Sequence, residues 1–182
     1  MYLQPKEAKK FFKIWLGLLA FVNDKYKLVK DFGHPKDSTK TKIKPVFEIK
    51  TKLWENTGII DEYIDSVWDL PREEIKILKG WKSKIEGTFI IVRHLKKYSV
   101  FLDGKKELLY GVLGITYPIS RMYPNNTLPK MVETVLLPFN NQIIYDGMFC
   151  SYNFHFGPNM RKDLKDLYME IKKERGIIST LE

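Results

Sequence analysis

Apolar residues near the start of the chain recur at the three- and four-residue spacing of a helix. Phe11, Trp15, Leu18 and Val22 form one stripe within the segment that begins at Pro5. Side chains at this spacing lie on one face of a helix, where they pack against other elements. The pattern therefore predicts a first helix that contributes to the core.

Two further helical patterns follow, separated from the first by a polar stretch. Residues 31–45 are rich in Lys, Thr, Ser and Asp, which predicts an exposed loop. The segment from Ile59 to Trp68 has an apolar face and an acidic face, as expected for a surface helix. A third helix is expected to begin at Pro71, since proline suits the first helical position, and to end at Gly87.

Beyond this point the pattern changes from the helical period to that of strands. Thr88–His94, Tyr98–Leu102 and Leu108–Leu113 are rich in β-branched and aromatic residues. Asp103-Gly104 lies between the second and third runs, and this pair favours a tight turn with positive φ at both residues. We therefore expect a hairpin with this pair at its tip.

The last third of the chain predicts two more strands and a closing helix. The strands are Val132–Leu137 and Gln142–Tyr145, joined by a turn at residues 138–141. Before them, Thr116–Lys130 holds three prolines and two tyrosines, which suits either a binding loop or a short helix with turns. The closing helix is expected to begin at Pro158.

Together these elements predict an α+β fold in a single domain, residues 1–182. Helices occupy about residues 1–86, and a central antiparallel sheet of about five strands, able to close as a small barrel, occupies about 87–157. The closing helix, about 158–176, is expected to pack on the sheet. Trp15, Trp81, Leu164 and Leu167 are predicted to be largely buried, because each lies on an apolar stripe.

Composition favours a folded chain in a reducing compartment. Hydrophobic residues make up 44% of the 182 residues, which is enough for a substantial core. A single cysteine, Cys150, cannot form an internal disulfide, and the apolar run of Phe11–Val22 is shorter than the roughly 20 residues that span a bilayer. We expect a cytoplasmic protein without a membrane segment.

The net charge of +9 is unevenly distributed along the chain. Residues 1–52 carry a net +8, residues 53–75 a net −6, and residues 76–106 a net +7. Two basic blocks separated by an acidic block could attract a polyanion, or could neutralise one another within the fold. Both interpretations remain open at the level of sequence.

The sequence has no motif typical of a metal, nucleotide or other cofactor site, so we expect no cofactor and assign no catalytic residue. Gly33–Thr41 lacks the second glycine of a phosphate-binding loop. Glu48-Ile49-Lys50, with Asp37 upstream, could fit the acid-and-lysine pattern of a nuclease only if Glu48 lay on a strand. A second enzyme hypothesis is a hydrolase or nuclease site near Asp146 and His155, with Tyr145 and Cys150 close by.

The strongest binding signal is the interleaving of cations and aromatic residues around the predicted hairpin. Lysines neutralise phosphates and aromatic rings stack on bases, which is how small sheets hold single strands. The alternation of a strand places Lys97 and Phe101 on one face, as the exposed pair. The predicted nucleic-acid-binding residues are Arg93, Lys96, Lys97, Phe101, Lys105 and Lys106.

Two segments of the second half resemble a group of uncharacterised bacterial proteins. They are Trp81-Lys82 with Gly87–Lys97, and Val132–Phe139 with Ile143–Gly147. The resemblance implies a bacterial, intracellular origin and transfers no activity. We therefore expect a non-catalytic binding or regulatory protein whose partner is nucleic acid or another protein.

Overall fold

The structure is a computed structural model that describes residues 1–30, 32 and 43–181. Most of the predicted polar loop, residues 31–45, lies outside the described residues. This includes Asp37 and the whole of the segment compared with a phosphate-binding loop, residues 33–41. The chain divides into two compact units, Lys6–Lys82 and Met1–Pro5 with Ser83–Glu182. That the two units form a single domain over residues 1–182 stays a prediction.

The first unit is helical and has an aromatic core. Trp15 stacks on Trp54 and meets Trp81 edge to face, both with ring centroids 5.7 Å apart. Trp15 and Trp81 are buried, as predicted. No helix in the described residues is both long and apolar enough to cross a membrane. The helices are α1 (Pro5–Tyr26), α2 (Ile43–Glu55), α3 (Ile59–Ser66) and α4 (Arg72–Gly80), followed by a 3-10 turn, η2 (Trp81–Ser83).

Four expectations for this unit were wrong. The polar loop was expected to continue to residue 45 with no helix after it, but Ile43–Glu55 forms helix α2. Glu48 lies in this helix and not on a strand, as the nuclease pattern would require. Trp68 is fully exposed, because α3 ends at Ser66 and the helical phase is lost before the tryptophan. The third helix ends at Gly80, seven residues before Gly87, because the strand pattern already begins at Ile85.

Three lysines of the N-terminal basic block pair with carboxylates of the acidic block within this unit. Exposed ion pairs of this kind contribute little stability each, but they partly offset the positive field of the block. The pairs are Lys10–Glu73 and Lys13–Glu74, each at 2.6 Å, and Lys25–Glu62. For the described part of residues 1–52, part of the basic charge is therefore offset within the fold.

The second unit is a five-stranded barrel with an additional short strand. The strands pair in the order β1-β2-β3-β5-β4, and β4 pairs back with β1, which closes the sheet. β3 and β5 run parallel while the other pairs are antiparallel, so the sheet is mixed. The strands are β1 (Ile85–His94), β2 (Ser99–Asp103), β3 (Leu108–Leu113), β4 (Lys130–Phe139), β5 (Gln142–Tyr145) and β6 (Cys150–Ser151).

The α+β fold class is thus confirmed, and so is the predicted hairpin, but its turn differs. Asp103 is the last residue of β2 and pairs with Leu108, leaving a four-residue loop. The Oδ1 atom of Asp103 accepts hydrogen bonds from the backbone N–H groups of Lys105 and Lys106, at 3.0 and 3.1 Å. Positive φ occurs at Glu107 instead of the Asp-Gly pair, because these side-chain bonds hold a wider turn.

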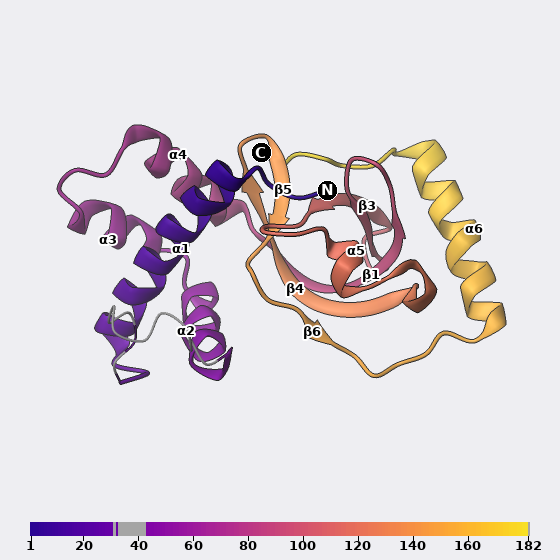
Figure 1. Cartoon of the computed structure of the whole chain (residues 1–182), viewed down its shortest axis with the longest axis horizontal. Coiled ribbons are helices and arrows are strands. Elements are labelled where there is room, and N and C mark those ends of the chain that lie inside the picture. The colour runs from indigo at the N-terminus through magenta and orange to yellow at the C-terminus, as the bar shows by residue number, and fades with distance from the viewer. Residues whose placement is uncertain (31, 33–42, 182) are drawn as a thin grey trace. The chain divides into compact units, whose positions relative to one another are not determined.

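Residues between β3 and β4 form a short helix and a turn, α5 (Ile119–Met122) and η3 (Asn125–Thr127). The closing helix, α6 (Pro158–Glu174), runs along the outside of the barrel, as Figure 1 shows in yellow. Tyr168 and Ile171 pack there on apolar residues of β2 and β3, and Leu164 and Leu167 are half-buried against the same cluster. Every residue of β2 is buried, because the strand has the barrel interior on one face and α6 on the other.

Candidate anion-binding cleft

The predicted nucleic-acid-binding residues do not form one patch. Lys96 and Lys97 lie in the turn before β2, and Lys105 and Lys106 lie in the turn after it. These turns are at opposite ends of a five-residue strand, roughly 17 Å apart at about 3.4 Å per residue. Phe101 is fully buried between Phe89 and Phe149, with ring centroids 6.2 and 6.0 Å away, so it has no face to offer a base.

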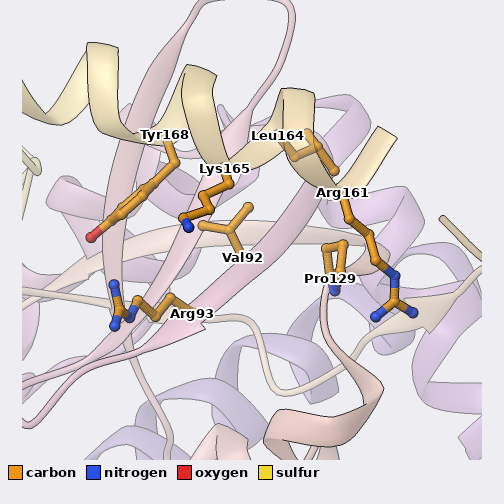
Figure 2. Close-up of a pocket in the computed structure, with 7 residues that line it drawn as sticks. All are labelled: Val92, Arg93, Pro129, Arg161, Leu164, Lys165 and Tyr168. Atoms are coloured by element: carbon orange, nitrogen blue, oxygen red, sulfur yellow. The ribbon is translucent and has the colours of Figure 1, made fainter. Parts of the chain in front are cut away.

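Arg93, the sixth predicted residue, lines a cavity of about 300 Å³ between α6 and β1. Figure 2 shows side chains that descend from α6 above Val92 and Arg93 of β1. Arg93 and Tyr168 lie at one end of this cleft, Arg161 and Pro129 at the other, and Lys165 lies between the two ends. We call this cavity the α6 cleft; its lining residues are Val92, Arg93, Pro129, Arg161, Leu164, Lys165 and Tyr168.

The α6 cleft is basic, and no carboxylate lines it. Arg161 is held by a hydrogen bond from its Nε to the carbonyl of Phe156, at 2.9 Å, which leaves the terminal nitrogens of its guanidinium for other acceptors. Among the described residues, no ion pair involves Arg93, Arg161 or Lys165. An anion that enters would therefore meet three cations without displacing a protein carboxylate.

The first turn of α6 adds to this positive potential. Its N-cap residue, Gly157, provides no side-chain hydrogen bond, and the turn contains no acidic residue. Free N–H groups at a helix N-terminus carry partial positive charge and bind anions, while cations placed there are unfavourable by about 0.3–1 kcal/mol each. Arg161 stands in this turn nonetheless, which is an arrangement that a bound anion would stabilise.

Tyr168 contributes a buried hydroxyl that has no hydrogen-bond partner among the described residues. Its side chain is only 4% exposed, because its ring packs in the cluster between α6 and the barrel. A buried polar group without a partner costs about 1–3 kcal/mol. The hydroxyl is therefore a donor whose partner the protein itself does not supply.

A second cavity, of about 430 Å³, adjoins the α6 cleft and shares Pro129 and Arg161 with it. Its walls add aromatic rings and the cationic side chain of Lys130, and again no carboxylate. Lys130 is anchored by a 2.8 Å hydrogen bond to the carbonyl of Tyr152, and Phe154 is 41% exposed. The remaining lining residues are Met122, Tyr123, Asn126, Thr127, Ser151, His155 and Phe156.

His94 holds Tyr123 in place on the wall of the second cavity. The Nε2–H of His94 donates to the carbonyl of Tyr123, and Nδ1 accepts from the hydroxyl of Ser99, both at 2.7 Å. This assignment follows because a carbonyl can only accept, so Nε2 carries the proton of the neutral ring. Burial lowers the pKa of His94, and the hydrogen bond to Tyr123 only partly opposes this effect.

The neutral state of His94 predicts a pH dependence of stability. A lowered pKa means that the unfolded chain binds the proton more tightly, so the free energy of unfolding should fall as pH drops below about 6.5 and be fully recovered above it. Urea denaturation at a series of pH values from about 5 to 8 measures this. His94→Gln should flatten the profile between these limits, whereas His155→Gln, at an exposed ring, should leave it unchanged. Equal profiles for the wild type and His94→Gln would contradict the assignment.

Of the four residues considered for a hydrolase site, only His155 lines either cavity. Asp146 is fully buried, and its Oδ1 accepts from the backbone N–H of Met148 at 3.3 Å, as in a turn. Cys150 is exposed on β6, and burial raises the pKa of Tyr145. Within the described part of the chain, no three His, Cys, Asp or Glu side chains converge as a metal site would require.

Sequence reasoning missed Arg161, Lys165 and Tyr168, which α6 contributes to the cleft. One signal was present: Arg161 is a cation in the first turn of a helix that lacks any acid there. Comparison of the chain with family models, with curated proteins and with solved structures finds no match.

Proposed function

We propose that the barrel unit binds single-stranded nucleic acid along the α6 cleft and the adjoining cavity. The observation that carries this proposal is the set of cations, Arg93, Arg161 and Lys165, that line a cavity without any carboxylate. Arginine forms forked hydrogen bonds with phosphate oxygens, which suits a nucleic-acid backbone.

The aromatic side chains of the second cavity support the same proposal. Tyr123 and Phe154 line it next to Arg161, so a base could stack there while its phosphate meets the guanidinium. Stacking on an aromatic ring contributes about 1–3 kcal/mol per base and tolerates any sequence. We therefore expect weak sequence preference and strong dependence on salt.

The architecture supports the proposal by analogy. A closed five-stranded barrel with strand order β1-β2-β3-β5-β4 is similar to the OB fold, which often binds oligonucleotides or oligosaccharides on its second and third strands. Here α6 covers the outer faces of β2 and β3, so that surface is occupied. The cleft that we propose lies at the edge of this helix, beside β1. Because fold does not determine function, the cations of the cleft are the stronger support.

A single-stranded oligonucleotide of about ten nucleotides tests the proposal in anisotropy titrations at low and physiological salt. Arg93→Glu with Arg161→Glu should weaken binding at least about tenfold and lower the slope of log K against log salt by about 0.7 per lost phosphate contact. The matched control is Lys105→Glu with Lys106→Glu, which makes the same change in charge at exposed residues outside the cleft. This control should retain most of the affinity.

Two outcomes would overturn the proposal. If the wild-type protein binds no oligonucleotide even at low salt, the nucleic-acid function fails and a protein partner becomes the better hypothesis. If both double variants lose affinity equally, binding follows the overall charge, and the α6 cleft is not the site. Thermal unfolding of each variant shows that the fold is intact before affinities are compared.

The compartment is also a proposal. A reducing environment such as the cytoplasm suits Cys150, because it is exposed and is the chain's sole cysteine. Nonreducing electrophoresis of protein purified without reductant tests for disulfide-linked dimers. The protein should form disulfide-linked dimers through Cys150 in air and migrate as a monomer under reducing conditions.

A further inference from the structure

We propose that His94 is a positioning residue for base stacking: it fixes Tyr123 on the wall of the second cavity without contacting the ligand. This inference rests on the function proposed above and concerns the bases of the ligand, not its phosphates. Three features support it: the way residues 122–129 are attached to the barrel, the hydrogen bonds of His94, and the position of His94 outside both cavities.

Residues 122–129 build much of the second cavity. Their backbone hydrogen bonds are local, such as the bond from the N–H of Thr127 to the carbonyl of Pro124 at 2.8 Å. A segment held largely by bonds to itself takes its position from its few attachments to neighbouring elements. Five of the residues that line the cavity come from this segment: Met122, Tyr123, Asn126, Thr127 and Pro129.

Tyr123 attaches this segment to the barrel. Its carbonyl accepts a hydrogen bond from the Nε2–H of His94 at 2.7 Å, and its hydroxyl pairs with that of Ser151 on β6. Among the described residues, the side-chain hydrogen bonds that join residues 122–129 to the strands are these two, and both involve Tyr123. His94 therefore sets the backbone from which the Tyr123 ring extends, while Ser151 holds the far end of the ring.

His94 itself lines neither cavity, so its effect on a ligand has to pass through Tyr123. The hydroxyl of Ser99 donates to its Nδ1 at 2.7 Å, so the imidazole is held on both sides. The register of β1 and β2 shifts between Ile91 and Arg93, and such bulges redirect side chains beside binding sites. The end of β1 thus serves both cavities through adjacent residues, Arg93 by lining the α6 cleft and His94 by holding Tyr123.

Two amide substitutions separate the two hydrogen bonds of His94. The amide nitrogen of glutamine extends about as far from the backbone as Nε2, so His94→Gln can still donate to the carbonyl of Tyr123. The shorter amide of asparagine ends near the position of Nδ1, so His94→Asn can still pair with Ser99 but leaves that carbonyl without its donor. Both variants remove the ring and both are uncharged, which makes His94→Gln the matched control.

The measurement is an anisotropy titration of one single-stranded oligonucleotide at several salt concentrations. The slope of log K against log salt reports phosphate contacts, whereas the affinity that remains at high salt includes the stacking of bases. His94→Asn should weaken binding about fivefold or more at every salt concentration and leave the slope unchanged, because only stacking is lost. His94→Gln should stay close to the wild type, and Arg93→Glu with Arg161→Glu should lower the slope instead.

Tyr123→Leu shows whether His94 acts through Tyr123. This variant keeps the carbonyl that His94 binds and removes the ring, so it should lose at least as much affinity as His94→Asn, again with an unchanged slope. Adding His94→Asn to Tyr123→Leu should then cost less than about twofold more, since residues that act as one unit are not additive. Amide hydrogen exchange needs no ligand: residues 122–129 should exchange faster in His94→Asn than in His94→Gln, while β1 exchanges equally in both.

The outcomes separate this inference from the proposed function. If the wild type binds through Arg93 and Arg161 but His94→Asn binds as tightly as His94→Gln, the inference is wrong and the proposed function stands. Full affinity in Tyr123→Leu leads to the same conclusion, and this variant can be measured even if His94→Asn does not fold. A lowered salt slope in His94→Asn, or an undiminished loss in the Tyr123→Leu background, also contradicts the inference. If the wild type binds no oligonucleotide, the proposed function fails and this inference fails with it.

Discussion

Gly114→Ala is expected to destabilise the barrel unit by about 3 kcal/mol or more, because the new side chain has no space. A Cβ atom at this position would lie 1.9 Å from the carbonyl oxygen of Tyr117, which is backbone and cannot turn aside. The same residue accepts a hydrogen bond from the N–H of Leu3 at 3.0 Å and donates one to the carbonyl of Met1 at 3.1 Å. A shift that relieved the clash would therefore weaken both bonds.

Gly104→Ala is the matched control for this substitution. No atom lies within 4 Å of a Cβ built at Gly104, and its φ lies outside the positive range. Alanine in such a place restricts the unfolded chain and stabilises by about 0.4–1 kcal/mol. Thermal and urea denaturation should thus separate the two variants, with a fall of about 6–12 °C in melting temperature for Gly114→Ala. Similar melting temperatures for both would contradict the close packing at Gly114.

Phe101→Ala is expected to cost about 3–5 kcal/mol of folding free energy, as for other buried aromatic residues. The ring is fully buried in the barrel and lies near Phe89 and Phe149. Its removal would leave a cavity that the closed sheet cannot collapse to fill. Equilibrium denaturation in urea gives the change directly.

Lys97→Ala is the control, since an exposed lysine in a turn should change stability by no more than about 0.5 kcal/mol. Phe101→Leu tests the alternative role, because it keeps much of the apolar volume and removes the aromatic face. Its affinity for the oligonucleotide should equal that of the wild type. A large loss of affinity in a folded Phe101→Leu protein would restore Phe101 as a stacking residue.

Elements whose signals are local could be predicted from the sequence. The stripe of Phe11, Trp15 and Leu18 specified the first helix, because helical spacing requires no knowledge of what covers the stripe. Residues 138–141 predicted a turn between β4 and β5, and the structure confines it to Asn140 and Asn141, both with positive φ as such a turn requires. Apart from α2 and the two-residue strand β6, which the patterns did not predict, the helices and strands appeared in the right order, which sufficed for the fold class.

The candidate site was predictable only in part, and the reason is physical. Arg93 was identified because it belongs to a stretch in which cations and aromatic residues alternate, but Arg161, Lys165 and Tyr168 reach it from about 70 residues along the chain. Periodicity states which residues share a face of one element and not which element covers that face. Alternation likewise assigned Phe101 to the exterior, since it could not show that β2 has neighbours on both faces.

The apolar faces of most helices and strands and the excess of lysines were determined by the sequence alone, because each depends on residues that are neighbours along the chain. Closure of the barrel, with β3 parallel to β5, was decided by tertiary structure, and so was the neutralisation of Lys10, Lys13 and Lys25 by distant acids. Tertiary structure likewise decided that Arg93, Arg161 and Lys165 line one cleft between α6 and β1. Charges far apart in sequence produce a binding field only when packing brings them together, and packing is a property of the whole fold.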